Sequence, residues 1–217
     1  MKTYLYRYLW FTLGVVINSF GIAFITKAAL GTSPISSLPY VLSFACPLSF
    51  GQTTFMVNLI FILLQIVLLR KAFHPVQFLQ IAVNLLFSVC IDSSMGLLSW
   101  LTPTGPVAAA AALVAGCAIL GLGISIEVAP GVVMVPGEGA VSALTAVLRK
   151  RFGSVKVAFD VTLALSACLL SLTLLHGLQG LGFGTVISAL LVGRFVNFFN
   201  RYLPLIPRIA QLKHCPA

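Results

Sequence analysis

Residues 21–42 read GIAFITKAALGTSPISSLPYVL, and residues 123–144, which lie 102 positions further on, read GISIEVAPGVVMVPGEGAVSAL. Aligned without a gap, the two segments share their opening Gly-Ile, their Pro and their closing Leu. The alignment extends outward to pair Gly14 with Gly116 and Phe50-Gly51 with Phe152-Gly153. Apolar identities arise easily by chance in so hydrophobic a chain, so the matched Gly and Pro positions carry most of the weight. A duplicated hydrophobic chain is typical of membrane proteins built on a pseudo-two-fold axis, whose binding sites lie where the copies meet.

The composition assigns the chain to the membrane. Of the 217 residues, 59% are hydrophobic and 8% are charged, and the mean hydropathy is +1.09, which excludes an ordinary soluble domain with a polar shell. The net charge of +9 does not indicate a nucleic-acid partner, because the basic residues are dispersed and form no basic face interleaved with aromatic residues. We expect these residues to orient the protein against the cytoplasmic leaflet.

Six segments are long enough to cross the roughly 30 Å hydrocarbon layer as helices. They are residues 8–27, 53–70, 76–98, 106–126, 155–175 and 180–200. Two shorter stretches, 34–46 and 138–149, occupy the same place in each copy, between its first and second long helices. The first is entered through Ser33-Pro34 and the second through Pro136-Gly137, residues of the kind that begin helices.

The basic residues favour one topology over another. If the short stretches do not cross the membrane, each copy has three spans, the second copy is inverted, and both termini are cytoplasmic. The pair Arg70-Lys71 and the run Arg149–Arg151 then both lie in the cytoplasm, whereas they fall on opposite sides if the short stretches do cross. We therefore predict an all-α polytopic protein of two inverted three-span repeats, each with a short broken or re-entrant helix. The repeats are residues 1–103 and 104–204, followed by a cytoplasmic basic tail at 205–217.

Several motifs, taken as a set, resemble one family. They are Leu30-Gly31-Thr32-Ser33-Pro34, Gly137-Glu138-Gly139, Phe152-Gly153-Ser154-Val155-Lys156 with Asp160, and Gly182-Phe183-Gly184-Thr185-Val186 with Gly193. Their order and spacing over about residues 8–200 are similar to those of the bacterial YczE/YitT-type integral membrane proteins. The resemblance implies a location in the bacterial inner membrane and supplies no substrate.

Acidic residues are scarce, and all of them lie in or beside apolar segments, where an ionised carboxylate costs several kcal/mol unless it is paired or hydrated. They are Asp92, Glu127, Glu138 and Asp160. Lys156 precedes Asp160 by four residues, so the two project from one helix face. One interpretation is an intrahelical ion pair near the cytoplasmic interface. The other is a carboxylate that binds a solute or a proton, with its charge tuned by the lysine.

The 102-residue shift pairs residues of unlike charge: Asp160 with Asn58, Lys156 with Thr54, Glu138 with Ser36, and Arg194 with Asp92. Equivalent residues of inverted copies lie at opposite depths, so the first member of each pair should line the inner half of a pathway and the second the outer half. This predicts that Arg194 meets Asp160 or Glu138 and does not pair directly with Asp92.

The short stretches supply a second candidate feature. A helix that begins inside a bundle points unsatisfied N–H groups and a partial positive charge at whatever precedes it. Ser33 can cap the first short helix, and the glycines around Glu138 allow close backbone approach at the second. Glu138 either caps the dipole of its own helix or contributes to binding a cationic or zwitterionic solute.

These residues favour a secondary-type transporter of a small polar or charged solute, with its site at the repeat interface. The substrate-binding candidates are Asp160, Lys156, Glu138, Arg194, Asn58, Asp92, Ser33 and Ser36. The alternatives are a non-transporting accessory or scaffold for a partner enzyme or transporter, and an intramembrane enzyme acting on lipid. We expect no catalytic residue, metal or cofactor. The expected partners are membrane lipid and a small-molecule solute, without nucleic acid, and a homodimer is left open.

Overall fold

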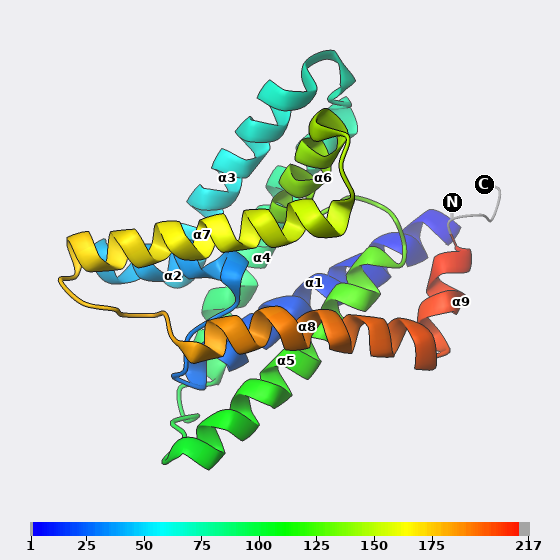
Figure 1. The fold of residues 1–217 in the computed structure, drawn as a ribbon. Coiled ribbons are helices and arrows are strands. Elements are labelled where there is room, and N and C mark those ends of the chain that lie inside the picture. The colour runs from blue at the N-terminus through cyan, green and yellow to red at the C-terminus, as the bar shows by residue number, and fades with distance from the viewer. Residues whose placement is uncertain (1, 213–217) are drawn as a thin grey trace. The chain divides into compact units, whose positions relative to one another are not determined.

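The computed structural model describes residues 2–212, which form helices and no strand (Figure 1). Six of the helices are long and apolar enough to cross a membrane, so this is a multi-pass membrane protein. These six spans are Tyr4–Lys27, Phe50–Ala72, Pro75–Leu97, Pro106–Val128, Phe152–Leu174 and Phe183–Tyr202. The six predicted segments are therefore confirmed, with ends that differ by a few residues.

The helices carry the labels of Figure 1. They are α1 (Lys2–Lys27), α2 (Pro34–Ala45), α3 (Phe50–Leu69), α4 (Leu79–Leu97), α5 (Pro106–Val128), α6 (Pro136–Leu148), α7 (Phe152–Leu174), α8 (Phe183–Tyr202) and α9 (Leu205–Gln211), with short 3-10 turns at Arg70–Ala72 and Pro75–Phe78. The basic composition of residues 205–217 does not predict the short helix α9, which the structure shows at Leu205–Gln211. Lys213, His214 and Cys215 of that tail lie outside the described residues.

The starts and ends of the two short helices follow from local chemistry. Pro34 and Pro136 each occupy the first helical position, where the missing N–H group is no loss. After α6 the chain turns at Arg149, which adopts a left-handed conformation with φ of 53°. After α2, Ser49 begins α3 through a reciprocal capping box with Gln52. Both short helices are thus fixed at the places in each copy where the sequence predicted them.

The chain divides into two compact units, each built from segments of both halves of the sequence. The first unit comprises Met1–Ser33, Cys90–Val132 and Gly182–Ala217, and the second comprises Pro34–Val89 and Val133–Leu181. The boundary between them falls within α4. The first unit therefore contains α1, α5, α8 and α9, and the second contains α2, α3, α6 and α7.

In the first unit, α1 packs along α5 through glycines that allow close backbone approach (Figure 1). The contacts are Gly14 with Glu127, Asn18 with Gly123, Gly21 with Leu120, and Ile25 with Gly116. Residue numbers rise along α1 as they fall along α5, so the two helices are antiparallel. A Cβ atom added to Gly21 would lie 2.5 Å from the backbone nitrogen of Leu120, and one added to Gly123 would lie 2.5 Å from that of Asn18.

The four contacts of α1 with α5 form two matched pairs. The 102-residue shift converts the Gly14–Glu127 contact into the Gly116–Ile25 contact. It also converts Gly21–Leu120 into Gly123–Asn18. The shift that aligns the sequence halves therefore also relates their contacts in this unit.

In the second unit, the 102-residue shift also relates pairs of contacting elements. Helix α3 packs against α6, and its counterpart α7 packs against α2, the counterpart of α6. The buried core of this unit contains Val57, Phe61, Ala140 and Leu163, with Ile35, Leu38, Leu42, Leu64 and Phe159 packed against it. The shift relates Val57 to Phe159 and Phe61 to Leu163, and the Phe61 and Phe159 rings meet edge to face with centroids 5.3 Å apart. Equivalent positions thus line both sides of one core.

Candidate functional site

The second unit brings together three charged residues of the candidate set. The Nζ atom of Lys156 lies 3.2 Å from Oδ1 of Asp160, so these residues form the ion pair that their spacing on α7 predicted. Their side chains are 27% and 20% exposed, so a small molecule can contact the pair. Glu138, in the first turn of α6, lies close enough for the charges of Lys156 and Asp160 to act on it. Helix α6 packs against α7, so two carboxylates and one ammonium group lie within electrostatic range of one another.

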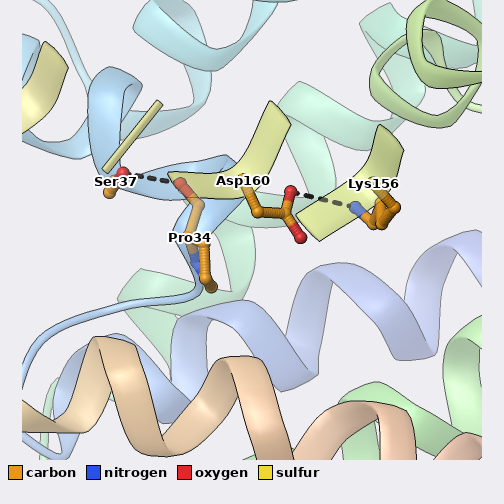
Figure 2. A network of polar contacts seen from close by, with 4 residues as sticks. All are labelled: Pro34, Ser37, Lys156 and Asp160. Carbon is orange, nitrogen blue, oxygen red and sulfur yellow. Dashed lines mark hydrogen bonds and ion pairs between the residues drawn. The ribbon is translucent and has the colours of Figure 1, made fainter. Parts of the chain in front are cut away.

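The site lies at the start of a short helix. Figure 2 shows Asp160 beside the first turn of α2, in which Ser37 Oγ donates a hydrogen bond to the Pro34 carbonyl at 2.5 Å. Helix α7 packs against α2, so the carboxylate stands next to the partial positive charge of that helix N-terminus. Glu138 holds the corresponding position in the first turn of α6 itself. A carboxylate accompanies the beginning of each short helix.

The two helix beginnings also meet each other. A Cβ atom added to Gly137 would collide with the Ile35 side chain, and Gly137 is the shift-equivalent of Ile35. Ser36, the next residue of α2, is 4% exposed. The first turns of α2 and α6 therefore touch within the second unit, and the charged residues lie around this contact.

Asn58 belongs to a buried amide network that the sequence did not reveal. Its Nδ2 donates to Oδ1 of Asn84 at 2.8 Å, and Asn84 Nδ2 donates to the Phe55 carbonyl at 3.0 Å. Gln65 and Gln80 exchange two hydrogen bonds of 3.0 Å each. These hydrogen bonds join α3 to α4. The four amide side chains are between 0% and 7% exposed, so the network lies inside the unit.

Gln65 also fixes the start of α6. Its Nε2 donates to the Pro136 carbonyl at 3.1 Å, and a Cβ atom added to Gly139 would lie 2.6 Å from Gln65 Oε1. Glu138 lies between Pro136 and Gly139 in the sequence. The Gln65–Gln80 pair therefore positions the turn that carries the Glu138 carboxylate.

The other candidates belong to the first unit. Ser33 is buried immediately before α2, Asp92 is half-buried on α4, and Arg194 is exposed on α8. The structure thus groups Asp160, Lys156, Glu138, Asn58 and Ser36 in one unit. That Arg194 meets Asp160 or Glu138, and that it does not pair with Asp92, stay predictions.

The first unit contains a polar pair that the candidate set omitted. Asn18 Nδ2 donates to Oε2 of Glu127 at 2.6 Å, and the two residues are 5% and 2% exposed. Glu127 was noted as an acidic residue in an apolar segment, but its partner lies 109 positions away and no local spacing links them. Among residues 2–212, no group of three or more His, Cys, Asp or Glu side chains could hold a metal ion.

Comparison with known proteins identifies a family but no activity. Over residues 5–201, the chain matches the protein family described as "Family of unknown function (DUF6198)". No curated protein and no solved structure matches it.

Proposed function

The chain belongs to this family of unknown function, and we propose from its own residues that it is a secondary-type membrane transporter of a small polar or charged solute. The proposed site is the charged group formed by Asp160, Lys156 and Glu138 around the first turns of α2 and α6. The two halves of the chain would form an inverted repeat and rock against each other around this site, with protonation of Asp160 or Glu138 as a coupling step.

The observation that carries this proposal is the reciprocity of the contacts. Helices α1 and α5 are shift-equivalent, antiparallel and joined by contacts that the shift exchanges, such as Gly14–Glu127 with Gly116–Ile25. Equivalent helices that run in opposite directions are expected of an inverted repeat, whose pseudo-two-fold axis lies in the membrane plane. The contact of Ile35 with its equivalent Gly137 supports an axis that passes between the two short helices.

The charges narrow the class of solute. Lys156 is paired with Asp160 and acts electrostatically on Glu138, and each helix N-terminus contributes a partial positive charge of about half a unit. A site of such mixed sign favours a zwitterion or a small organic cation over a simple anion, because an anion would compete with carboxylates already placed at the helix starts.

We further propose that the protein resides in the cell membrane of a bacterium with both termini in the cytoplasm. Arg70, Lys71 and the run Arg149–Arg151 are all exposed, as positively charged cytoplasmic segments would be.

The test is a thermal-shift screen of the detergent-purified protein against amino acids, amines, carboxylic acids and inorganic anions. A ligand that binds only the folded state raises the apparent melting temperature by mass action. The hit should lose its effect in Asp160→Asn and keep it in Thr162→Val, a matched change at an exposed residue of the same helix. Proteoliposomes that contain the wild-type protein should then take up the compound that binds. Binding of no compound, together with copurification of a fixed protein partner, would support the accessory role instead.

A further inference from the structure

Glu127 is the most deeply buried carboxyl side chain among residues 2–212, and it belongs to the first unit, whereas the proposed solute site belongs to the second. It belongs to α5, contacts α1 at Gly14 near the middle of that helix, and is 2% exposed. Ionisable residues inside membrane helices are costly and usually functional. Glu127 therefore calls for an explanation that the Lys156–Asp160 group does not provide.

The equivalent positions in the other half of the chain show whether helix packing alone requires the Glu127–Asn18 pair. Glu127 is the shift-equivalent of Ile25, and Asn18 is the shift-equivalent of Leu120. At the other end of the α1–α5 contact, Ile25 packs on Gly116 and Leu120 packs on Gly21, with both side chains 3% exposed or less. The same helix packing is thus achieved with two apolar residues, so packing does not require the Glu127–Asn18 pair.

The chemistry of the pair suits a group that changes its protonation state. A carboxylate accepts a hydrogen bond from the Asn18 amide N–H, as the 2.6 Å contact shows, whereas a protonated carboxyl group can donate to the Asn18 amide oxygen. Rotation of the amide exchanges the two arrangements, so Asn18 can hold Glu127 in either form.

The helices that pack on α5 carry basic residues. Helix α5 packs against α1, α8 and α9, and none of these helices contains a carboxylate. Among the side chains that the structure describes, their charged or titratable residues are Tyr4, Tyr6, Arg7, Tyr8 and Lys27 on α1, Arg194, Arg201 and Tyr202 on α8, and Arg208 on α9. The Arg7 guanidinium donates to the Pro130 and Gly131 carbonyls just beyond Glu127, both at 3.1 Å. Arg7 therefore places a cation at the end of α5 that carries Glu127.

We propose that Glu127 is a proton-binding site in the first unit, with Asn18 as its positioning residue. Binding forms an O–H bond on a Glu127 carboxylate oxygen with a proton from water, and release returns that proton to water. A role in coupling rests on the transport function proposed above, whereas the proton site itself can be tested without any solute.

The experiment is infrared difference spectroscopy of the protein in lipid vesicles, stepped from alkaline to acidic pH in H2O and in D2O. Acidification should produce a carbonyl-stretch band of a protonated carboxyl group that shifts in D2O. This band should be absent in Glu127→Gln and present in Glu138→Gln and Asp160→Asn. Identical pH-difference spectra for the wild-type protein and a folded Glu127→Gln variant would overturn the proposal.

A second variant keeps the test decisive if Glu127→Gln does not fold. Asn18→Leu introduces the residue found at the equivalent position of the other half and retains the carboxyl group. In Asn18→Leu, the proton concentration at which half of the Glu127 band appears should change by more than a factor of ten. An unchanged midpoint would contradict the proposal. Because these readouts need no solute, a failed transport assay and a failed proton site are distinguishable.

Discussion

Ile35 and Gly137 occupy equivalent positions in the two halves of the chain, and they touch each other at the first turns of α2 and α6. Two residues related by the 102-residue shift are therefore in contact. A Cβ atom at Gly137 would collide with Cδ1 of Ile35, which is the end of a flexible side chain and not backbone.

Gly137→Ala should destabilise the protein by about 1 kcal/mol, at the low end of the cost of overpacking, because the Cδ1 methyl group of Ile35 can move aside. Adding Ile35→Val, which removes the clashing Cδ1 methyl group, should recover part of the loss. Gly153→Ala is the control, because no atom lies within 4 Å of a Cβ atom added there. Thermal unfolding of the wild-type protein and these three variants in one detergent measures the effects, and a double variant no more stable than Gly137→Ala would contradict this account of the contact.

The α1–α5 contact predicts that Gly21→Ala and Gly123→Ala lower the stability of the protein by similar amounts. Each introduces a Cβ atom 2.5 Å from a backbone nitrogen, which cannot move aside as the end of a flexible side chain can. We expect each to lower stability by more than about 2 kcal/mol. Gly96→Ala, which meets nothing within 4 Å, should leave the melting temperature unchanged or slightly raised. A large effect at one glycine and none at its equivalent would argue against reciprocal packing.

The Gln65–Gln80 pair predicts strong coupling between two substitutions. Gln65→Leu or Gln80→Leu alone leaves the remaining buried amide without its partner, at a cost of about 1–3 kcal/mol. The double Leu variant removes both amides and should lose less than the sum of the two single losses. Chemical or thermal unfolding of the four proteins gives this coupling energy, and simple additivity would show that the hydrogen bonds contribute little.

The Lys156–Asp160 pair should matter more for binding than for stability. Partly exposed ion pairs four residues apart contribute about 0.3–0.5 kcal/mol, so Asp160→Asn should hardly alter the melting temperature of the solute-free protein. The thermal shift produced by the screened ligand should nevertheless disappear. A large loss of intrinsic stability with retained ligand response would identify the pair as purely structural.

Much of the helical framework could be predicted from the sequence, because each element is specified by neighbouring residues. Apolar length gave the six spans, and Pro34 and Pro136 marked the starts of the short helices. The Lys156–Asp160 pair was predictable for the same reason, since a four-residue spacing fixes which side chains share a helix face.

The partners of distant residues could not be predicted in this way. Asn18 and Glu127 are 109 positions apart, and Gln65 lies 71 positions from Pro136. Which faces of two helices meet depends on packing of the whole bundle. The repeated glycines Gly14, Gly21, Gly116 and Gly123 were the available signal, because small residues at matched positions permit the close approach that brings Asn18 to Glu127.

The central claim is that the two halves cross the membrane in opposite directions, and an impermeant maleimide applied to intact cells tests it most directly. The native Cys46, which is exposed, is compared with Lys71→Cys and Lys150→Cys, each as the single cysteine of the chain. The account predicts that Cys46 is labelled from outside, whereas Lys71→Cys and Lys150→Cys react only after the membrane is permeabilised. Labelling of Lys71→Cys from outside, with Lys150→Cys reached only from within, would contradict the inverted arrangement.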